Sequence, residues 1–104
     1  MKIYISGAIT DDLNYEEKFE RAERFLLEQG HSVVNPAAVA YGEEFSYKDF
    51  IDMDLNALMR CDAIYMLNGW GKSKGARLEL LYAVTVGLDV YYQEGEESES
   101  SYSV

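Results

Sequence analysis

The sequence predicts an α/β fold, an open parallel sheet of four to five strands in a three-layer α/β/α sandwich. Segments with strand-like apolar patterns alternate regularly with segments of helical periodicity, which is typical of α/β proteins. One strand segment, residues 63–67, is almost wholly apolar, as in a strand covered on both faces. The chain has 104 residues and is 48% hydrophobic, which suits a single domain with a core.

The first half of the chain contains two predicted strands and one helix. Residues 2–6 alternate apolar and polar side chains, which indicates a strand. We expect the helix to start with Asn14 as its N-cap and Glu17 as the reciprocal capping partner, and to end at Gly30. Residues 32–34 form a short second strand.

The second half repeats this alternation twice. Ser46–Asp49 has the pattern of a helix start, and residues 63–67 form the third strand. A glycine-rich loop at 68–71 leads to a third helix over 75–86. Residues 88–92 form the last strand, so the predicted order is β-α-β-α-β-α-β.

This order predicts a flavodoxin- or Rossmann-like topology with right-handed crossovers. Ligands of such sheets bind beyond the carboxyl ends of the strands. That edge is built here from residues 6–10, 35–45 and 68–74. The sequence therefore predicts a ligand site formed by these three segments.

Charge and cysteine content exclude several classes of function. With 9 basic and 19 acidic residues the net charge is −10, which disfavours binding of nucleic-acid polymers or anionic membranes. We expect residues 1–93 to form the domain and residues 94–104 a disordered acidic tail. No transmembrane stretch or signal peptide is evident. The lone Cys61 excludes a disulfide framework and indicates a cytoplasmic location, and no metal-ligand cluster or cofactor motif is evident.

A basic segment interrupts this acidity. Lys72, Lys74 and Arg77 lie close together with no acidic residue between the first and the last. Ser73 or Gly75 stands at the start of the third helix, where free N–H groups and the helix dipole attract anions. The pattern indicates a phosphate or carboxylate site, although it is neither a Walker A sequence nor a dinucleotide-binding fingerprint.

Two carboxylates have positions unlike those of solubilising charge. Asp54 lies within the apolar stripe of its helix, where a carboxylate is partly buried and needs a partner. It is either a ligand-binding group or an aspartate at the edge of the stripe. Glu79 shares a helix face with small residues that leave space for a ligand. It is either a functional carboxylate or an exposed glutamate paired with a nearby cation.

The first strand and the glycine-rich loop supply the remaining candidates. The Tyr4 hydroxyl either reaches the carboxyl-end site or belongs to the core. Trp70 either stacks on a base or packs against the sheet edge. A turn of small residues follows the first strand and suits close approach of a ligand: Ser6, Gly7, Ala8 and Ile9.

Together these residues resemble the nucleoside 2-deoxyribosyltransferase superfamily. Residues 3–9 are similar to the family's opening strand and glycine turn, and residues 53–58 with 61–64 to its Asp-Leu helix and third strand. Residues 75–79 resemble the Gly-x-x-x-Glu segment that carries the nucleophile. Order and spacing agree over residues 2–92, in a version similar to a small branch common in bacteriophage genomes.

The resemblance implies cleavage of an N-glycosidic bond with Glu79 as nucleophile. Asp54 and Tyr4 would hold the sugar or tune the ionisation of Glu79. The segment 72–74 lacks the Asp that true transferases carry, and Tyr4 matches the tyrosine of deoxynucleoside 5′-monophosphate N-glycosidases. The chain therefore looks closer to those glycosidases, although Thr10 replaces an Arg that commonly contacts the phosphate.

The resemblance also implies a small-molecule nucleoside or nucleotide as ligand, no metal or other cofactor, and a homodimer or larger homo-oligomer. A second hypothesis is a non-catalytic protein that captures a nucleotide or nucleotide-derived signal. A third is an interaction domain without a small-molecule site, since fold alone does not imply function.

Overall fold

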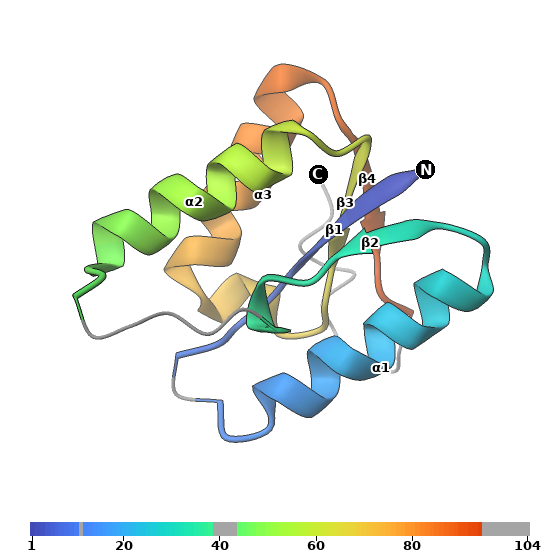
Figure 1. Ribbon diagram of the computed structural model, residues 1–104, viewed down its shortest axis with the longest axis horizontal. Helices are drawn as coiled ribbons and strands as arrows, with labels where there is room; N and C mark the ends of the chain where they lie inside the picture. The colour runs from blue at the N-terminus through green and yellow to red at the C-terminus, as the bar shows by residue number, and fades with distance from the viewer. Residues whose placement is uncertain (11, 39–43, 95–104) are drawn as a thin grey trace.

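The computed structural model describes residues 1–10, 12–38 and 44–94 (Figure 1). The predicted acidic tail lies outside these ranges, apart from Glu94. The strands are β1 (Lys2–Ser6), β2 (Ser32–Val34), β3 (Ala63–Met66) and β4 (Asp89–Tyr92). The helices are α1 (Tyr15–Glu28), α2 (Tyr47–Met59) and α3 (Lys74–Val86), with short 3₁₀ turns η1 (Pro36–Ala38) and η2 (Trp70–Lys72). Within the described part of the chain, no helix has the length and apolarity needed to cross a membrane.

The four strands form one parallel sheet in the order β2-β1-β3-β4. Helix α1 lies on one face of this sheet, and α2 and α3 lie on the other (Figure 1). The predicted parallel α/β sandwich of three layers is therefore confirmed, with four strands. This Rossmann-like arrangement makes β1 a central strand, flanked on both sides by partners.

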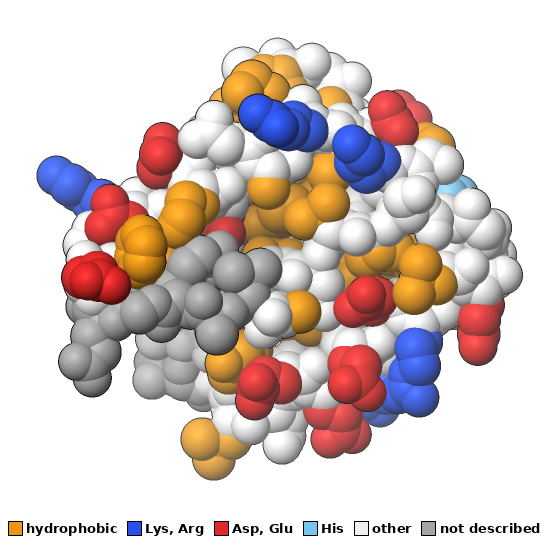
Figure 2. Space-filling view, viewed as in Figure 1, with side chains coloured by type: hydrophobic (Ala, Val, Ile, Leu, Met, Phe, Trp, Pro, Cys, Tyr) orange, Lys and Arg blue, Asp and Glu red, His pale blue; other side chains and the backbone are white. Residues whose placement is uncertain are grey.

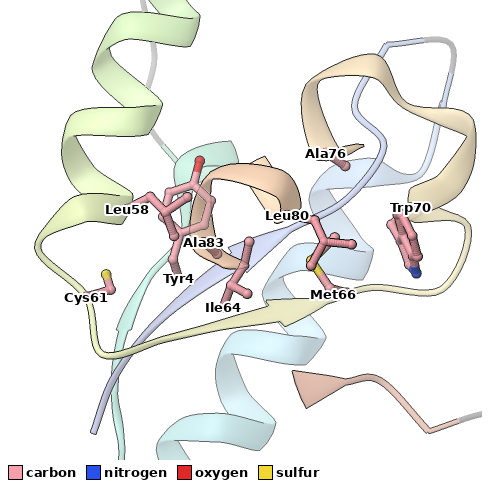
Figure 3. Packing of buried hydrophobic residues seen from close by; sticks show 9 residues of the cluster. All are labelled: Tyr4, Leu58, Cys61, Ile64, Met66, Trp70, Ala76, Leu80 and Ala83. Atoms are coloured by element: carbon pink, nitrogen blue, oxygen red, sulfur yellow. The ribbon is translucent and has the colours of Figure 1, made fainter. Parts of the chain in front are cut away.

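The alternation along β1 separates two hydrophobic cores. Ile3 and Ile5 face α1, whereas Tyr4 faces α2 and α3. The core beneath α2 and α3 runs from Cys61 at one end to Trp70 at the other (Figure 3). Because successive strand residues point to opposite faces, Ser6 shares the face of Tyr4.

Two helix starts differ in how well the sequence predicts them. At α2, the Ser46 side chain accepts a hydrogen bond from the Asp49 backbone, and the Asp49 side chain accepts one from the Ser46 backbone. This capping box agrees with the predicted helix start at Ser46–Asp49.

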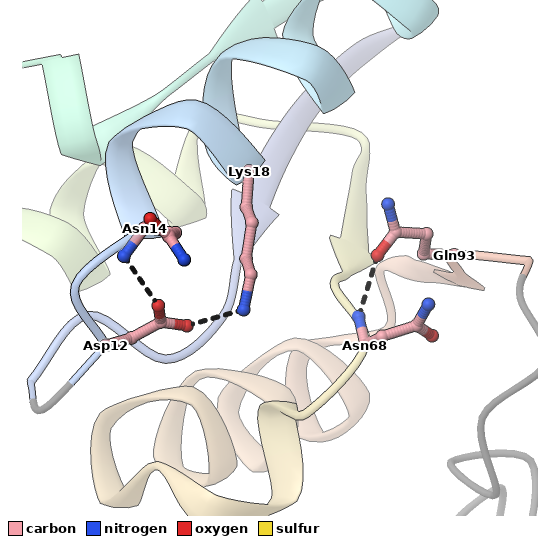
Figure 4. A network of polar contacts seen from close by, with 5 residues as sticks. All are labelled: Asp12, Asn14, Lys18, Asn68 and Gln93. Atoms are coloured by element: carbon pink, nitrogen blue, oxygen red, sulfur yellow. Dashed lines mark hydrogen bonds and ion pairs between the residues drawn. The ribbon is translucent and has the colours of Figure 1, made fainter.

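At α1, the predicted capping pair of Asn14 and Glu17 is wrong. Asn14 occupies the N-cap position, but its side chain makes no capping hydrogen bond. Its ψ angle of 19° is far from the extended value that aims a capping side chain at the first turn. The Asp12 carboxylate accepts hydrogen bonds from the Asn14 backbone and from Lys18 Nζ instead, both at 2.9 Å (Figure 4).

The carboxyl ends of β3 and β4 are joined by a side chain. The Asn68 backbone N–H donates to Oε1 of Gln93 at 2.8 Å (Figure 4). The Gln93 backbone N–H donates to the Met66 carbonyl, which extends the sheet pairing by one residue beyond β4. These bonds fix the start of the glycine-rich loop that leads to α3.

Candidate active site

A cavity of about 880 Å³ opens at the carboxyl edge of the sheet. It lies between the start of α1, the N-terminal half of α2 and the start of α3. Its lining includes eight of the residues predicted for the site: Gly7, Ile9, Asp54, Lys72, Ser73, Lys74, Gly75 and Glu79. These side chains therefore meet at the carboxyl edge of the sheet, where the sequence predicts the ligand site.

Glu79 is the most enclosed carboxylate of this cavity, with 6% of its surface exposed. The Tyr4 hydroxyl donates a hydrogen bond to Oε2 at 2.8 Å, and the Ser6 hydroxyl donates one to Oε1 at 2.6 Å. Both donors come from the same face of β1, so each carboxylate oxygen is held by a side chain of the central strand. Glu79 is not an exposed surface residue, and Tyr4 is both a core residue and part of the site.

Two carboxylates of the cavity ionise close to neutral pH. Burial raises the pKa of Glu79 to about 7, against the opposing effect of the Ser6 and Tyr4 hydrogen bonds and with a further rise from the Asp54 charge. Burial also raises the pKa of Asp54 to about 6. Perturbed pKa values of this kind gather at functional sites because general acids and bases need them.

Asp54 lies on α2, half-buried among the apolar residues of that helix. Its place in the helical stripe, four residues after Phe50, turns it toward the cavity. A carboxylate there is costly unless something in the cavity compensates it, and this favours the ligand-binding alternative for Asp54.

The loop before Glu79 brings positive charge to one wall. Lys72, Ser73 and Lys74 line the cavity at the N-terminus of α3. Ser73 Oγ accepts a hydrogen bond of 3.1 Å from the Ala76 backbone, which leaves its hydroxyl proton free to donate elsewhere. Arg77 is not part of this wall, because its Nη1 donates to the Gly71 carbonyl at 2.7 Å and holds the loop from outside.

Four predicted residues lie outside the cavity lining. Tyr4 and Ser6 lie behind Glu79 and contact its carboxylate. Trp70 is 6% exposed and packs in the core (Figure 3). The centre of its ring lies 6.2 Å from that of the Tyr92 ring. Of the two alternatives for Trp70, the structure favours packing against the sheet edge. Ala8 is half-buried and is not part of the lining either.

An apolar wall completes the cavity, and the sequence analysis missed most of it. The additional lining residues come from β1 and the loop after it, from α1 and α2, and from the turn after β2: Ile5, Thr10, Tyr15, Phe19, Pro36, Ala37, Tyr47, Phe50 and Ile51. Helical spacing could have identified two of them. Phe50 and Ile51 precede Asp54 by four and three residues, so they share its face of α2.

The surface around the site is mixed in charge. Figure 2 shows acidic side chains over the part of this face where α1 lies, and apolar side chains in the middle of the face between α1 and α2. A larger cavity of about 1070 Å³ lies between α1 and β4, but neither Glu79 nor Asp54 lines it. We therefore assign the site to the smaller cavity. In the ranges that the structure describes, no three His, Cys, Asp or Glu side chains group as a metal site.

The fold is similar to those of two solved enzymes. A 2-deoxyribosyltransferase from Bacillus psychrosaccharolyticus superposes with a TM-score of 0.71 at 20% identity, covering 88% of this chain and 71% of that one. A CMP N-glycosidase from Clostridium botulinum gives a TM-score of 0.65 at 19% identity, covering 97% of this chain and 78% of that one. The resemblance inferred from the sequence is therefore confirmed at the level of the fold.

The sequence itself places the chain in a family. No curated protein matches it. One family model, described as a domain of unknown function (DUF4406), matches residues 1–92, nearly the whole described chain. The protein is therefore a member of the DUF4406 family.

Proposed function

We propose that this protein cleaves the N-glycosidic bond of a nucleoside or nucleotide, as an N-glycosidase or a deoxyribosyltransferase, with Glu79 as nucleophile. The observation that carries the proposal is the Glu79 carboxylate, held by Tyr4 and Ser6 at the wall of a cavity that it shares with Asp54. The similar fold of the two solved enzymes, a deoxyribosyltransferase and a CMP N-glycosidase, supports this choice of reaction.

The chemistry needs a carboxylate beside the anomeric carbon. As the N-glycosidic bond breaks, the base leaves with the bonding electron pair and takes up a proton, and positive charge develops at C1′. The Glu79 carboxylate attacks C1′ and forms a glycosyl ester. Water, or a second base in a transferase, then attacks C1′ and releases Glu79. In this proposal Asp54 holds the sugar hydroxyls, and its charge raises the pKa of Glu79.

We propose a nucleoside 5′-monophosphate as the preferred substrate. Lys72, Lys74 and Ser73 give the cavity a positive wall at the start of α3. An anionic group there would meet two lysines, a hydroxyl donor and the positive end of a helix. Thr10 also lines the cavity, as a neutral residue at the position where the deoxynucleoside 5′-monophosphate N-glycosidases that the sequence resembles commonly have an Arg. The lysines are our proposed substitute for that missing charge.

The first experiment is a panel of ribo- and deoxyribonucleosides, each with and without a 5′-phosphate, with release of free base measured by chromatography. We expect release by the wild type, faster with the 5′-phosphate, and a loss of at least about 10³-fold in Glu79→Ala. Glu28→Gln removes an exposed carboxylate of α1 and serves as the matched control. An active Glu79→Ala variant would exclude Glu79 as the nucleophile.

The alternative function is capture of a nucleotide without turnover. The observation that favours it is the lysine-bearing wall, which suits anion binding whether or not chemistry follows. Calorimetry separates the two: salt-sensitive binding of a nucleotide that is recovered intact would favour the binding protein.

We also propose that the protein is a homo-oligomer. Three apolar side chains of α3 are strongly exposed, at 39%, 63% and 50% for Leu78, Leu81 and Val84. Burial of such side chains in a subunit interface would remove them from water. Light scattering coupled to size exclusion tests this, with Leu81→Glu expected to shift the protein toward the monomer.

A further inference from the structure

We infer that Ser6 is a positioning residue, which orients the Glu79 carboxylate through its Oε1 atom and does not contact the substrate. This inference rests on the proposed function, because it assigns the orientation of the group that we propose as nucleophile. It differs from the expectation that the turn beginning at Ser6 forms a surface for close approach of a ligand.

The position of Ser6 excludes contact with a molecule in the cavity. Its side chain has 0% exposure and is absent from the cavity lining, whereas Glu79 is part of that lining. The bond of 2.6 Å from Ser6 Oγ to Glu79 Oε1 runs from the sheet side of the carboxylate. Ser6 can therefore act on a ligand only through Glu79.

Two donors on one strand fix the plane of the carboxylate. Tyr4 holds Oε2 and Ser6 holds Oε1, and these donors are two residues apart on β1. One bond alone would leave the carboxylate free to rotate about its terminal torsion, which is broad in glutamate. With both bonds, the remaining lone pairs of Glu79 keep one direction toward the cavity.

The hydrogen bond from Ser6 also affects the ionisation of Glu79. A hydrogen bond donated to a carboxylate favours its charged form, and the Ser6 bond lowers the pKa of Glu79 against the effect of burial. The ionisable groups that act on Glu79 are Tyr4 from β1 and Asp54 from α2. Four more ionisable side chains line the cavity: Tyr15, Tyr47, Lys72 and Lys74. Replacement of Ser6 by alanine removes one of the two hydroxyl donors to Glu79 with almost no change of shape.

The test is Ser6→Ala, with the pKa of Glu79 followed by carbon-13 NMR of labelled glutamate carboxyl groups in the full chain. Glu79→Gln identifies the Glu79 signal by its loss. We expect the pKa of Glu79 to rise by about one pH unit or more in Ser6→Ala. Thr85→Ala removes a hydroxyl that donates to the Leu81 carbonyl on α3, and it should leave that pKa unchanged.

Ser6→Cys retains a weak donor of similar size, so we expect an intermediate shift. It also keeps the test informative if Ser6→Ala folds poorly. An unchanged pKa of Glu79 in folded Ser6→Ala, or in Ser6→Cys if only that variant folds, would overturn the inference.

Activity gives a second, separate measurement. In an active protein, the acid limb of the kcat/KM profile should move to higher pH together with the pKa of Glu79. The kcat/KM of Ser6→Ala should therefore be about tenfold or more below that of the wild type at pH 6 and close to it at pH 9. An equal loss at both pH values would indicate a merely structural role and overturn the inference. Because the NMR titration needs no turnover, a protein that shows the shift but releases no base would contradict the proposed function and leave the role of Ser6 intact.

Discussion

The Tyr4 hydroxyl donates a hydrogen bond of 2.8 Å to Oε2 of Glu79, although the two residues are 75 positions apart in the chain. Tyr4 belongs to a central strand of the sheet and is fully buried. Glu79 is therefore anchored to the most enclosed part of the fold. A carboxylate held in this way needs little reorganisation when charge develops next to it.

Removal of that anchor should destabilise the protein in a pH-dependent way. Tyr4→Phe leaves the buried Oε2 of Glu79 without this donor, and we expect a loss of about 1–3 kcal/mol in the free energy of unfolding at pH 8. The loss should be smaller at pH 5, where Glu79 is protonated and depends less on donors. Urea unfolding at both pH values measures this, with Tyr91→Phe on the exposed side of β4 as control. Equal stability of Tyr4→Phe and the wild type at pH 8 would refute the anchoring role.

Glu79 itself should limit stability at alkaline pH. Its pKa is raised from 4.5 in the unfolded chain to about 7 in the fold, so its contribution to stability is fully present below pH 4.5 and is lost as the pH rises through 7. That shift corresponds to roughly 3 kcal/mol. Glu79→Gln should therefore unfold at higher urea concentration than the wild type at pH 8, and the difference should shrink toward pH 5. A Glu79→Gln variant that is less stable than the wild type at pH 8 would contradict the raised pKa.

Asp54 should shift the pH profile in the direction opposite to that expected for Ser6→Ala. Its negative charge raises the pKa of Glu79, so Asp54→Asn should lower that pKa. We expect the acid limb of kcat/KM, near pH 7 in the wild type, to move down by up to about one pH unit, with a lower plateau because a contact to the sugar is lost. Rates of base release between pH 5 and 9 measure both effects. Movement of the limb to higher pH in Asp54→Asn would be inconsistent with this arrangement.

Two glycines of the cavity should respond differently to alanine. A Cβ on Gly7 would lie 3.0 Å from Cβ and Cδ1 of Leu67, so Gly7→Ala should cost about 1–3 kcal/mol of stability. A Cβ on Gly75 would meet nothing closer than the Tyr47 hydroxyl at 3.7 Å. Gly75→Ala should therefore keep or improve stability, since alanine favours helices, while it weakens nucleotide binding at the start of α3. Thermal unfolding measures the stability of the two variants, and calorimetry measures their nucleotide binding. A Gly7→Ala variant of unchanged stability together with a destabilised Gly75→Ala variant would refute this prediction.

Much of the fold could be predicted because the local signals agree with the global arrangement. The apolar run of β3 and the alternation of β1 each identify their strand, and β-α alternation then determines the parallel sheet. The start of α1 could not be predicted in the same way. Asn14 has the right residue type for a cap, but its backbone conformation is set by Asp12 and Lys18 nearby. Capping geometry of this kind depends on contacts that residue type alone does not specify.

The site could be predicted only in part. The sequence alone left Glu79 between an exposed and a functional position, and its helical periodicity cannot distinguish them. The hydrogen bonds from Tyr4 and Ser6 identify Glu79 as a buried group of the site, and these bonds depend on how α3 packs against β1. For Trp70 the sequence left open whether the ring stacks on a base or packs against the sheet edge, and the ring packs in the core. In both cases tertiary packing decides what the local sequence leaves open.

The central claim is that Glu79 attacks the anomeric carbon, and trapping of the glycosyl ester tests it most directly. A 2′-deoxy-2′-fluoro nucleotide should slow breakdown of the ester, because fluorine destabilises the positive charge that develops at C1′. After incubation, intact-protein mass spectrometry should show the wild type with one fluorinated sugar added, and peptide mapping should assign that mass to Glu79. Glu79→Gln should gain no mass. Base release by the wild type without any adduct, or an adduct on a residue other than Glu79, would contradict the account.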